Sequence, residues 1–298
     1  MNPAHRVPVA SRVYTPAPGE ASDVEHMPAG DVTDGVVRVG GTIRRPHQPQ
    51  SFAVGEYLDW LDDAGFEGSP RFLGRDAQGR DVLTFVPGQC AGACPEAWAQ
   101  SGDLLVSVGR LVRRLHTAST GFVPQAHPFP PRPVRPNPTE AAGLICHLDI
   151  TPQNVVVRDG LAAGLVDFDL AGPATAFHDS LNTAMHWVPL RDPSDAWPGW
   201  EHQDPFHRLR IFADAYGWTE EERRRVPGAG IDAAALSYER MRHNAAALGG
   251  GWARMWQDGV GGQIHRRRAW LEANAGPLVA ALTRWHAEPA QPSAAGQG

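Results

Sequence analysis

The most informative absence in this sequence is lysine, since all 27 basic residues of the 298-residue chain are arginine. Chemistry that requires a lysine is therefore excluded, including Schiff-base formation and the lysine of a Walker A phosphate loop. No apolar run approaches the length of about 18 residues that a membrane-spanning helix needs. The N-terminal 30 residues also lack the apolar stretch of a secretory signal. We therefore expect a cytoplasmic protein with no membrane partner.

Cysteine and net charge are also low. Cys90, Cys94 and Cys146 are the only cysteines, and no Cys/His pair completes a zinc-binding pattern with them. We expect all three to be reduced and structural. The net charge of −6 gives no electrostatic reason to expect a nucleic-acid partner. Hydrophobic residues make up 42% of the chain, which is ordinary for a folded protein and excludes wholesale disorder.

The N-terminal third is predicted to be rich in strands. Residues 1–30 are interpreted as a flexible leader, and residues 31–87 as a small lobe of strands with one helix. Apolar residues at helical spacing predict a helix over residues 52–64. Strands are predicted around a Gly-Gly hairpin and around a polar turn, at 36–39, 42–45, 71–74 and 81–86.

Residues 88–287 are predicted to form a larger, mostly helical lobe, followed by a disordered tail over 288–298. Six apolar residues between Leu104 and Leu115 form one stripe of a helix. Short strands are predicted at 144–146, 155–157 and 164–166, and the chain from Asp179 to about Trp285 is predicted to be helical.

The segment that carries chemistry lies between these short strands. Asp149 and Asn154 share one loop, His147 begins it, and Asp167 follows the next strand of a hairpin. The hairpin brings Asn154 and Asp167 together beside Asp149. Two carboxylates and an amide oxygen at one point form a hard, oxygen-rich site that suits Mg²⁺.

This segment resembles the HxDxxxxN…[IV]D[FW]D signature of the aminoglycoside phosphotransferase family, in the branch of trifolitoxin-immunity-like phosphotransferases. The resemblance covers roughly residues 30–285 and is loosest after Pro193. It implies an α+β, bilobal protein-kinase-like fold. It also implies a small-molecule O-phosphotransferase that uses Mg²⁺ and moves the γ-phosphate of ATP or GTP to a hydroxyl of a small-molecule acceptor.

The resemblance assigns a role to each matching residue. Asp149 would accept the proton of the substrate hydroxyl, and His147 would hold the backbone of the catalytic loop. Asn154 and Asp167 would hold the metal ion. Asp179 would brace the catalytic loop.

Four further roles in nucleotide binding follow from the resemblance. The backbone of Thr84 to Gln89, with Thr84 and Val86 as the contact residues, would hold adenine. An arginine must replace the phosphate-binding lysine, and Arg44 is favoured over Arg45 because it shares a strand face with Thr42. Glu56 is the candidate partner of that arginine. Gly30–Gly35 would cover the phosphates.

The missing lysine and the lack of an obvious partner glutamate are departures from the family pattern. They leave a second hypothesis, a catalytically degenerate kinase-like module for binding or immunity. A third, a metal-dependent phosphohydrolase, would use the pair His178-Asp179 with His147 and His186. The acceptor is expected to be an antibiotic or natural product, and neutral or partly apolar. Leu181 to Gly298 holds 13 acidic residues and 13 arginines, which does not favour a polycation. We expect the runs Arg223–Arg225 and Arg266–Arg268 to be solvated helix faces.

Overall fold

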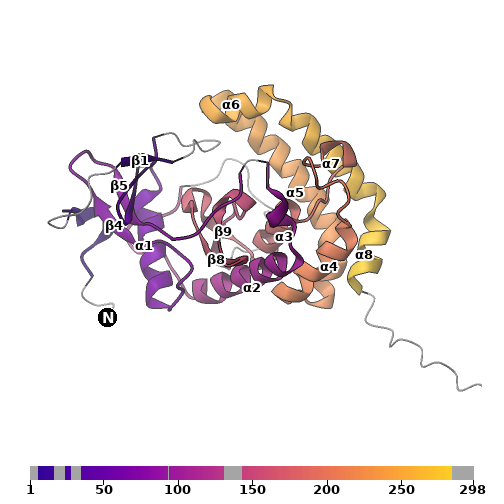
Figure 1. Cartoon of the computed structure of the whole chain (residues 1–298), viewed down its shortest axis with the longest axis horizontal. Helices are drawn as coiled ribbons and strands as arrows, with labels where there is room; N and C mark the ends of the chain where they lie inside the picture. The colour runs from indigo at the N-terminus through magenta and orange to yellow at the C-terminus, as the bar shows by residue number, and fades with distance from the viewer. Residues whose placement is uncertain (1–5, 17–23, 28–34, 93, 131–142, 284–298) are drawn as a thin grey trace, which may run out of the picture.

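The computed structural model describes residues 6–16, 24–27, 35–92, 94–130 and 143–283. Its elements fall into two parts, a small sheet with one helix and a larger body of helices (Figure 1). The arrangement is the α+β, two-lobed one that the sequence predicts. Most of the segment expected to cover the phosphates, residues 30–34, lies outside the described residues.

The small part is a five-stranded antiparallel sheet in the order β1-β2-β3-β5-β4. The predicted helix and four predicted strands are confirmed to within a few residues at each end. The elements are β1 (Val24–His26), β2 (Val37–Val39), β3 (Thr42–Arg45), α1 (Ser51–Asp63), β4 (Phe72–Arg75) and β5 (Asp81–Thr84).

Part of the expected leader is folded. Val9 is buried in the main core, and residues 24–26 form the edge strand β1. Arg6 and Arg12 both form ion pairs with Asp59 near the C-terminus of α1. Carboxylates there are unfavourable beside the partial negative charge of the helix end, so the two arginines offset an electrostatic penalty. Such pairing joins residues about 50 positions apart, which a local sequence pattern cannot reveal.

The connection between the two parts runs close against a hairpin of the larger one. Gly88 has a φ of 143°, and a Cβ placed on it would lie 2.4 Å from Cγ1 of Val156 and 2.6 Å from the carbonyl oxygen of Val157. Only glycine can lie so close to that strand. The next residue, Gln89, exchanges two backbone hydrogen bonds with Val157. The linker is thereby fixed to the strand that follows the catalytic loop.

The larger part combines two short antiparallel ribbons with seven helices among the described residues. β6 pairs with β9, which the sequence analysis did not predict, and β7 pairs with β8. The strands are β6 (Leu144–Cys146), β7 (Val155–Arg158), β8 (Leu161–Leu165) and β9 (Gly172–Ala174). The helices are α2 (Gly102–Ser119), α3 (Ala176–Trp187), α4 (Pro205–Tyr216), α5 (Glu220–Ala247), α6 (Gly250–Gln257), α7 (Val260–Ala273) and α8 (Ala275–Thr283).

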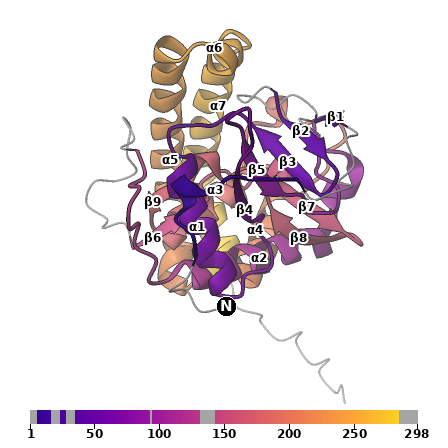
Figure 2. The same ribbon diagram turned by 90° about the vertical axis from the view of Figure 1, so that its left-hand side faces the viewer.

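Helix α2 is the central support of this part. The Ser101 side chain accepts a hydrogen bond from the Leu104 N–H and caps the helix. The predicted apolar stripe is fully buried against the ribbons and α4. α5 and α7 pack along each other and project beyond the other helices, with α6 at their far end (Figure 2). No helix among the described residues is long and apolar enough to cross a membrane.

Candidate active site

His147 fixes the start of the loop that carries the predicted catalytic residues. Its ring is fully buried, contacts the Phe168 ring at 4.4 Å between centroids, and its Nε2 hydrogen-bonds the carbonyl oxygen of Val166 at 3.0 Å. Burial disfavours the charged form and lowers the pKa of His147, even though the charge of Asp179 acts in the opposite direction. The neutral ring therefore donates to Val166 and joins the catalytic loop to the segment that carries Asp167.

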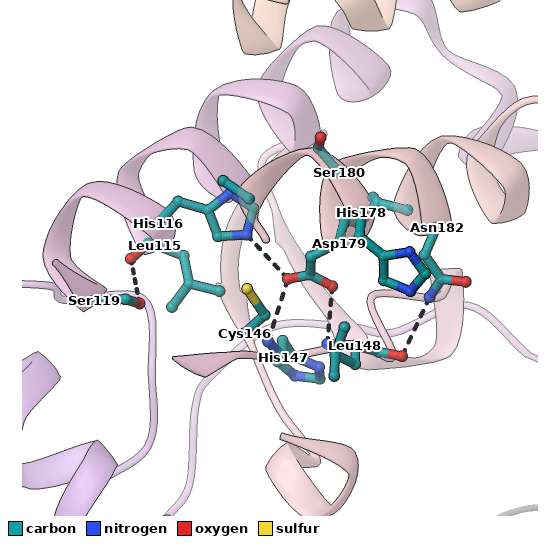
Figure 3. Close-up of polar contacts among 12 residues, drawn as sticks. Leu115, His116, Ser119, Cys146, His147, Leu148, His178, Asp179, Ser180 and Asn182 are labelled. Carbon is teal, nitrogen blue, oxygen red and sulfur yellow. Dashed lines mark hydrogen bonds and ion pairs between the residues drawn. The ribbon is translucent and has the colours of Figure 1, made fainter. Parts of the chain in front are cut away.

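Asp179, near the start of α3, holds the backbone of the same loop (Figure 3). Its carboxylate accepts hydrogen bonds from the N–H groups of His147 at 3.2 Å and Leu148 at 2.9 Å. Leu148 has a φ of 65°, a left-handed conformation that costs a leucine roughly 1–2 kcal/mol. Asn182 also donates to the carbonyl oxygen of Leu148 at 3.2 Å. Both peptide groups of the strained residue are thus held by α3.

Asp179 is ionised although it is fully buried. Burial by itself would raise its pKa, but the hydrogen bond and charge of His116, the charge of His147 and the Leu148 N–H together lower it below the usual value. His116 Nε2 lies 3.0 Å from the carboxylate, and its Nδ1 lies 2.8 Å from the Tyr216 hydroxyl. The carboxylate is therefore a buried structural anion with its own donors.

The same residues exclude a metal site at this point. His116, Cys146 and Asp179 place potential ligand atoms within 4.8 Å of one another. Both ring nitrogens of His116 already have hydrogen-bond partners, and the Asp179 oxygens accept backbone N–H groups. A metal ion would have to break this network. The geometry gives no support to a phosphohydrolase centre at His178-Asp179.

Asp149 and Asn154 are joined directly. The side-chain amide of Asn154 donates to Oδ2 of Asp149 at 2.9 Å and to its backbone oxygen at 2.9 Å. Because the NH₂ group faces Asp149, the amide oxygen is directed away from it. The backbone oxygen of Asn154 accepts from the Val166 N–H at 2.9 Å, so Asp167 follows the point where the two segments meet. The predicted trio of Asp149, Asn154 and Asp167 is brought together.

Asp167 also has an unusual backbone. Its φ is 60°, and its side chain is 45% exposed, in contrast to the buried Phe168 that follows. A left-handed aspartate is uncommon and such residues cluster at functional sites. The conformation turns the chain between the buried strand β8 and Phe168 and leaves an accessible carboxylate at the surface of the site.

The arginine that reaches this site is Arg45, so the preference for Arg44 is wrong. Nη1 of Arg45 lies 2.6 Å from Oδ1 of Asp169 and 3.6 Å from Oδ1 of Asp167. Nη1 of Arg44 instead lies 3.9 Å from Asp76 in the β4–β5 turn. Arg44 does share a strand face with Thr42, but its side chain lies at the β4–β5 turn, beside Asp76. The strand ends at Arg45, before Pro46, and the side chain of this last residue lies at the site.

Glu56 does not pair with either arginine. Its carboxylate accepts from the Gln125 N–H and contacts Nδ1 of His127 at 2.6 Å, on another side of α1. The carboxylate beside Arg45 is Asp81, which pairs with it across β3 and β5 and lies 4.0 Å from its Nε. Asp81 is fully buried and also contacts His47 and the Ser51 hydroxyl. Sequence reasoning missed Asp81, because it did not predict the pairing of β3 with β5 that places this residue opposite Arg45.

Asp169, the last aspartate of the [IV]D[FW]D signature, is a further residue of the site. Burial raises the pKa of Asp169, the charge of Arg45 acts against this, and the neighbouring Asp167 raises it again. Gln50, at the start of α1, donates to the Asp169 backbone oxygen at 3.3 Å. Arg45 and Gln50 thus tie the segment after β8 to the small lobe.

Thr84 and Val86 lie where the sheet meets the larger part. The Thr84 N–H donates to Arg71 and the Phe85 N–H donates to Gly41. The Val86 side chain packs against Gly164 of β8, since a Cβ added to that glycine would lie 3.1 Å from it. The linker backbone therefore runs past the β7–β8 ribbon.

Comparison with known proteins agrees with this geometry. The sequence profile of the phosphotransferase enzyme family matches residues 130–226. The trifolitoxin immunity protein of Rhizobium leguminosarum bv. trifolii is 30% identical over 192 residues, which cover 63% of this chain and 72% of that protein.

Solved structures share the fold. A choline/ethanolamine kinase family protein from Mesorhizobium loti superposes with a TM-score of 0.57 at 18% identity, covering 89% of this chain and 93% of that one. An amicoumacin kinase in complex with AMP-PNP, Ca²⁺ and Ami gives 0.54 at 13% identity, covering 84% and 88%. The profile match and the 30% identical relative show that the chain belongs to the phosphotransferase enzyme family, that of the aminoglycoside phosphotransferases.

Proposed function

We propose that this protein transfers the γ-phosphate of ATP or GTP to a hydroxyl group of a small molecule. The observation that carries the proposal is the bond from the Asn154 amide to the Asp149 carboxylate, beside the exposed Asp167. A carboxylate held in this way can accept the proton of a hydroxyl as the oxygen attacks phosphorus. The protein would contribute mainly positioning and charge stabilisation.

The donor atoms fit Mg²⁺. The Asn154 amide oxygen is directed away from Asp149, and Asp167 offers an accessible carboxylate, so both potential ligands are oxygens. Asn154 and Asp167 would hold the ion, which would neutralise charge on the phosphates of the nucleotide. His147 and Asp179 would keep Asp149 in place through the loop backbone.

Arg45 would take the part of the missing lysine. Its guanidinium offers five donors and remains charged, so it can bind a phosphate oxygen while it contacts Asp169. The Thr84 carbonyl and the Val86 N–H would bind the nucleotide base. The acceptor hydroxyl would lie at Asp149, on the side of the larger lobe.

The first test is nucleotide binding, measured by the shift in melting midpoint with ATP or GTP, each with and without Mg²⁺. The variant is Asp167→Asn, because asparagine tolerates the left-handed backbone while the charge is lost. The matched control is Asp159→Asn, since Asp159 has a φ of 52° at the exposed β7–β8 turn. We expect a Mg²⁺-dependent rise in wild type and in the control, and its loss in Asp167→Asn.

Release of ADP or GDP with a panel of hydroxyl compounds then measures transfer itself. Transfer that persists in Asp149→Asn would contradict the role of this carboxylate. No shift with either nucleotide at millimolar concentration would contradict the phosphotransferase as a whole.

A second candidate is a binding module that protects without phosphoryl transfer. The relative that is an immunity protein, and the engagement of Asp169 by Arg45, favour keeping it. Cells that express this protein would be challenged with candidate toxins or antibiotics. Protection that survives Asp149→Asn and Asp167→Asn would establish sequestration, and protection that disappears with either would establish phosphorylation.

A further inference from the structure

Three arginines from different elements of the larger lobe lie around His186, and the neighbouring Trp187 donates a hydrogen bond to the backbone oxygen of Ile150, the residue after Asp149. Arg191 follows α3, Arg240 lies on α5 and Arg267 lies on α7, and α5 packs against both helices. Their charges all act on His186 of α3 and, after burial, lower its pKa to about 3. The charge of Asp149 acts on Arg240, partly opposing the effect of burial on the pKa of that arginine. We call Arg191, Arg240 and Arg267 the arginine cluster.

The arginine cluster is partly buried and partly accessible to solvent. Each of its side chains keeps part of its surface accessible, although burial lowers the pKa of Arg191 to about 9 and that of Arg267 to about 10. Because an arginine guanidinium is not deprotonated in proteins, all three carry a positive charge at pH 7.5. Cations surrounded by protein and still open to solvent are costly to keep together.

Carboxylates do not offset this cost. In the part of the chain that the structure describes, no member of the cluster has a carboxylate oxygen within 4 Å. The buried Nε atoms of Arg191 and Arg240 likewise have no hydrogen-bond partner there. Asp195, whose charge acts on Arg191 and Arg267, accepts hydrogen bonds from Nε and Nη2 of the exposed Arg266 side chain.

Arg208, in the same lobe, is an arginine with a structural role and serves as a comparison. Arg208 is 4% exposed, and its guanidinium donates to the carbonyl oxygens of Gln100 at 2.6 Å and Trp187 at 3.1 Å. Arg191 is instead positioned by an aromatic ring, since its guanidinium carbon lies 4.0 Å from the centroid of Trp197. Such stacking orients the group and leaves its in-plane N–H donors for another partner.

We propose that the acceptor carries an oxyanion, a carboxylate, phosphate or sulfate group, which binds the arginine cluster while its hydroxyl lies at Asp149. The inference rests on the proposed phosphotransferase function and names the substrate class of that same site. It replaces the expectation of a neutral acceptor. The 13 arginines and 13 acidic residues from Leu181 onward balance overall, but arginine dominates beside Asp149.

The first experiment measures anion binding with inorganic sulfate as the probe, followed by tryptophan fluorescence. Full-length protein is saturated with AMP-PNP and Mg²⁺, so that the phosphate-binding region of the nucleotide is filled. Arg240→Gln and Arg267→Gln are expected to weaken sulfate binding about tenfold or more, since charged hydrogen bonds are lost.

The chain offers a matched control for each variant. Arg242→Gln changes an exposed arginine two residues along the same helix, paired with Glu239, and Arg268→Gln changes the neighbour of Arg267, paired with Glu272. Both controls should bind sulfate as wild type does. A general effect of net charge would weaken all four variants alike and would overturn the proposal, as would absence of sulfate binding to wild type.

The second experiment compares acceptors that differ only in charge, by nucleoside diphosphate release. Glycerate against glycerol and glucuronate against glucose are suitable pairs. We expect the anionic member to be used at least tenfold more efficiently, with the advantage lost in Arg240→Gln. Preference for the neutral member, or for aminoglycosides, would refute the anionic acceptor while establishing phosphoryl transfer. Sulfate binding at the cluster without any nucleotide binding would refute the phosphotransferase and leave a bare anion site.

Discussion

The arginines on the two sides of Asp149 and Asp167 differ in whether a carboxylate lies beside them. On the side of the small lobe, Arg45 is 9% exposed and contacts Asp169, with Asp167 and Asp81 close by. On the side of the helical lobe, Arg191, Arg240 and Arg267 have no carboxylate within 4 Å among the described residues. The charge of Arg45 is therefore neutralised by neighbouring aspartates. The charges of the arginine cluster are not neutralised by carboxylates of the described residues.

This difference separates structure from recognition. Removing one member of a buried ion pair leaves the other charge without compensation and destabilises the fold. Removing one of several like charges relieves repulsion and does not. On the side of the small lobe, stability and binding should therefore fall together. On the side of the helical lobe, binding should fall while stability stays the same or rises, and measuring both quantities in the same variants tests the comparison.

The largest effect is expected at the residue between the two sides. Asp149→Asn should lower kcat about 10³-fold, because a general base contributes roughly 10²–10⁴. Nucleotide binding should stay unchanged, since the Asn154 amide can still donate to the amide oxygen of the variant. Single-turnover kinetics and nucleotide titration check these points. A fall in nucleotide affinity comparable to the fall in kcat would show that Asp149 acts through the metal site instead.

On the side of the small lobe, Arg45→Gln should both unfold more easily and bind nucleotide less well. We expect a loss of about 3 kcal/mol in the free energy of unfolding, because Asp169 and Asp81 lose their cation. The KM for nucleotide should rise at least tenfold, and Arg45→Lys should restore part of it. Arg44→Gln is the matched control for nucleotide binding and should leave the KM for nucleotide unchanged, although the loss of its ion pair with Asp76 can lower stability. Equal effects at both positions would contradict the assignment of Arg45.

Asp179→Asn tests whether the Asp179 carboxylate holds the loop backbone at His147 and Leu148. The amide can accept only one of the two backbone N–H bonds well, and His116 loses its anion, so a loss of about 2–3 kcal/mol is expected. Leu148→Gly in the same background should recover part of kcat, because glycine adopts the left-handed backbone without strain. Denaturant unfolding and turnover measure the two effects. No recovery would show that the strained backbone is not what Asp179 holds.

On the side of the helical lobe, Arg240→Gln should raise the KM for an anionic acceptor about tenfold while the melting midpoint stays the same or rises. Relief of repulsion within the arginine cluster is the reason. Arg242→Gln should leave both quantities unchanged. A clear fall in the melting midpoint of Arg240→Gln would show that this arginine is structural, like Arg208, and would remove the contrast between the two sides.

The smallest effect is expected for His186, whose pKa is lowered by burial and by the charges of the arginine cluster. Burial and the three arginines lower its pKa to about 3, below the value of about 6.5 in an unfolded chain. As the pH falls, the unfolded chain therefore takes up the proton first. The stability associated with neutral His186 is complete above pH 6.5 and is lost progressively between about pH 6.5 and pH 3. His186→Gln should flatten the curve of unfolding free energy against pH in that interval, and a curve as steep as that of wild type would contradict the shift.

The sequence alone determined much of this protein. Apolar periodicity located α1 and α2, the glycine hairpin located β2 and β3, and the spacing from His147 to Asp167 located the site. These features are local: a helix face, a two-residue turn or a loop between adjacent strands depends on neighbours within about 20 positions. The absence of lysine, which is a property of composition, also excludes the phosphate-binding lysine of kinases from this chain.

Tertiary structure alone decided which charges meet. Arg45 was separated from Arg44 by where β3 ends, and Asp81 rather than Glu56 became its neighbour through strand pairing. Arg191, Arg240 and Arg267 are spread over more than 70 residues, and composition counted them as balanced. The packing of α5 against α3 and α7 brings Arg240 and Arg267 close to His186, and the charge of Asp149 acts on Arg240, because electrostatic energy depends on distance in space and not on separation along the chain.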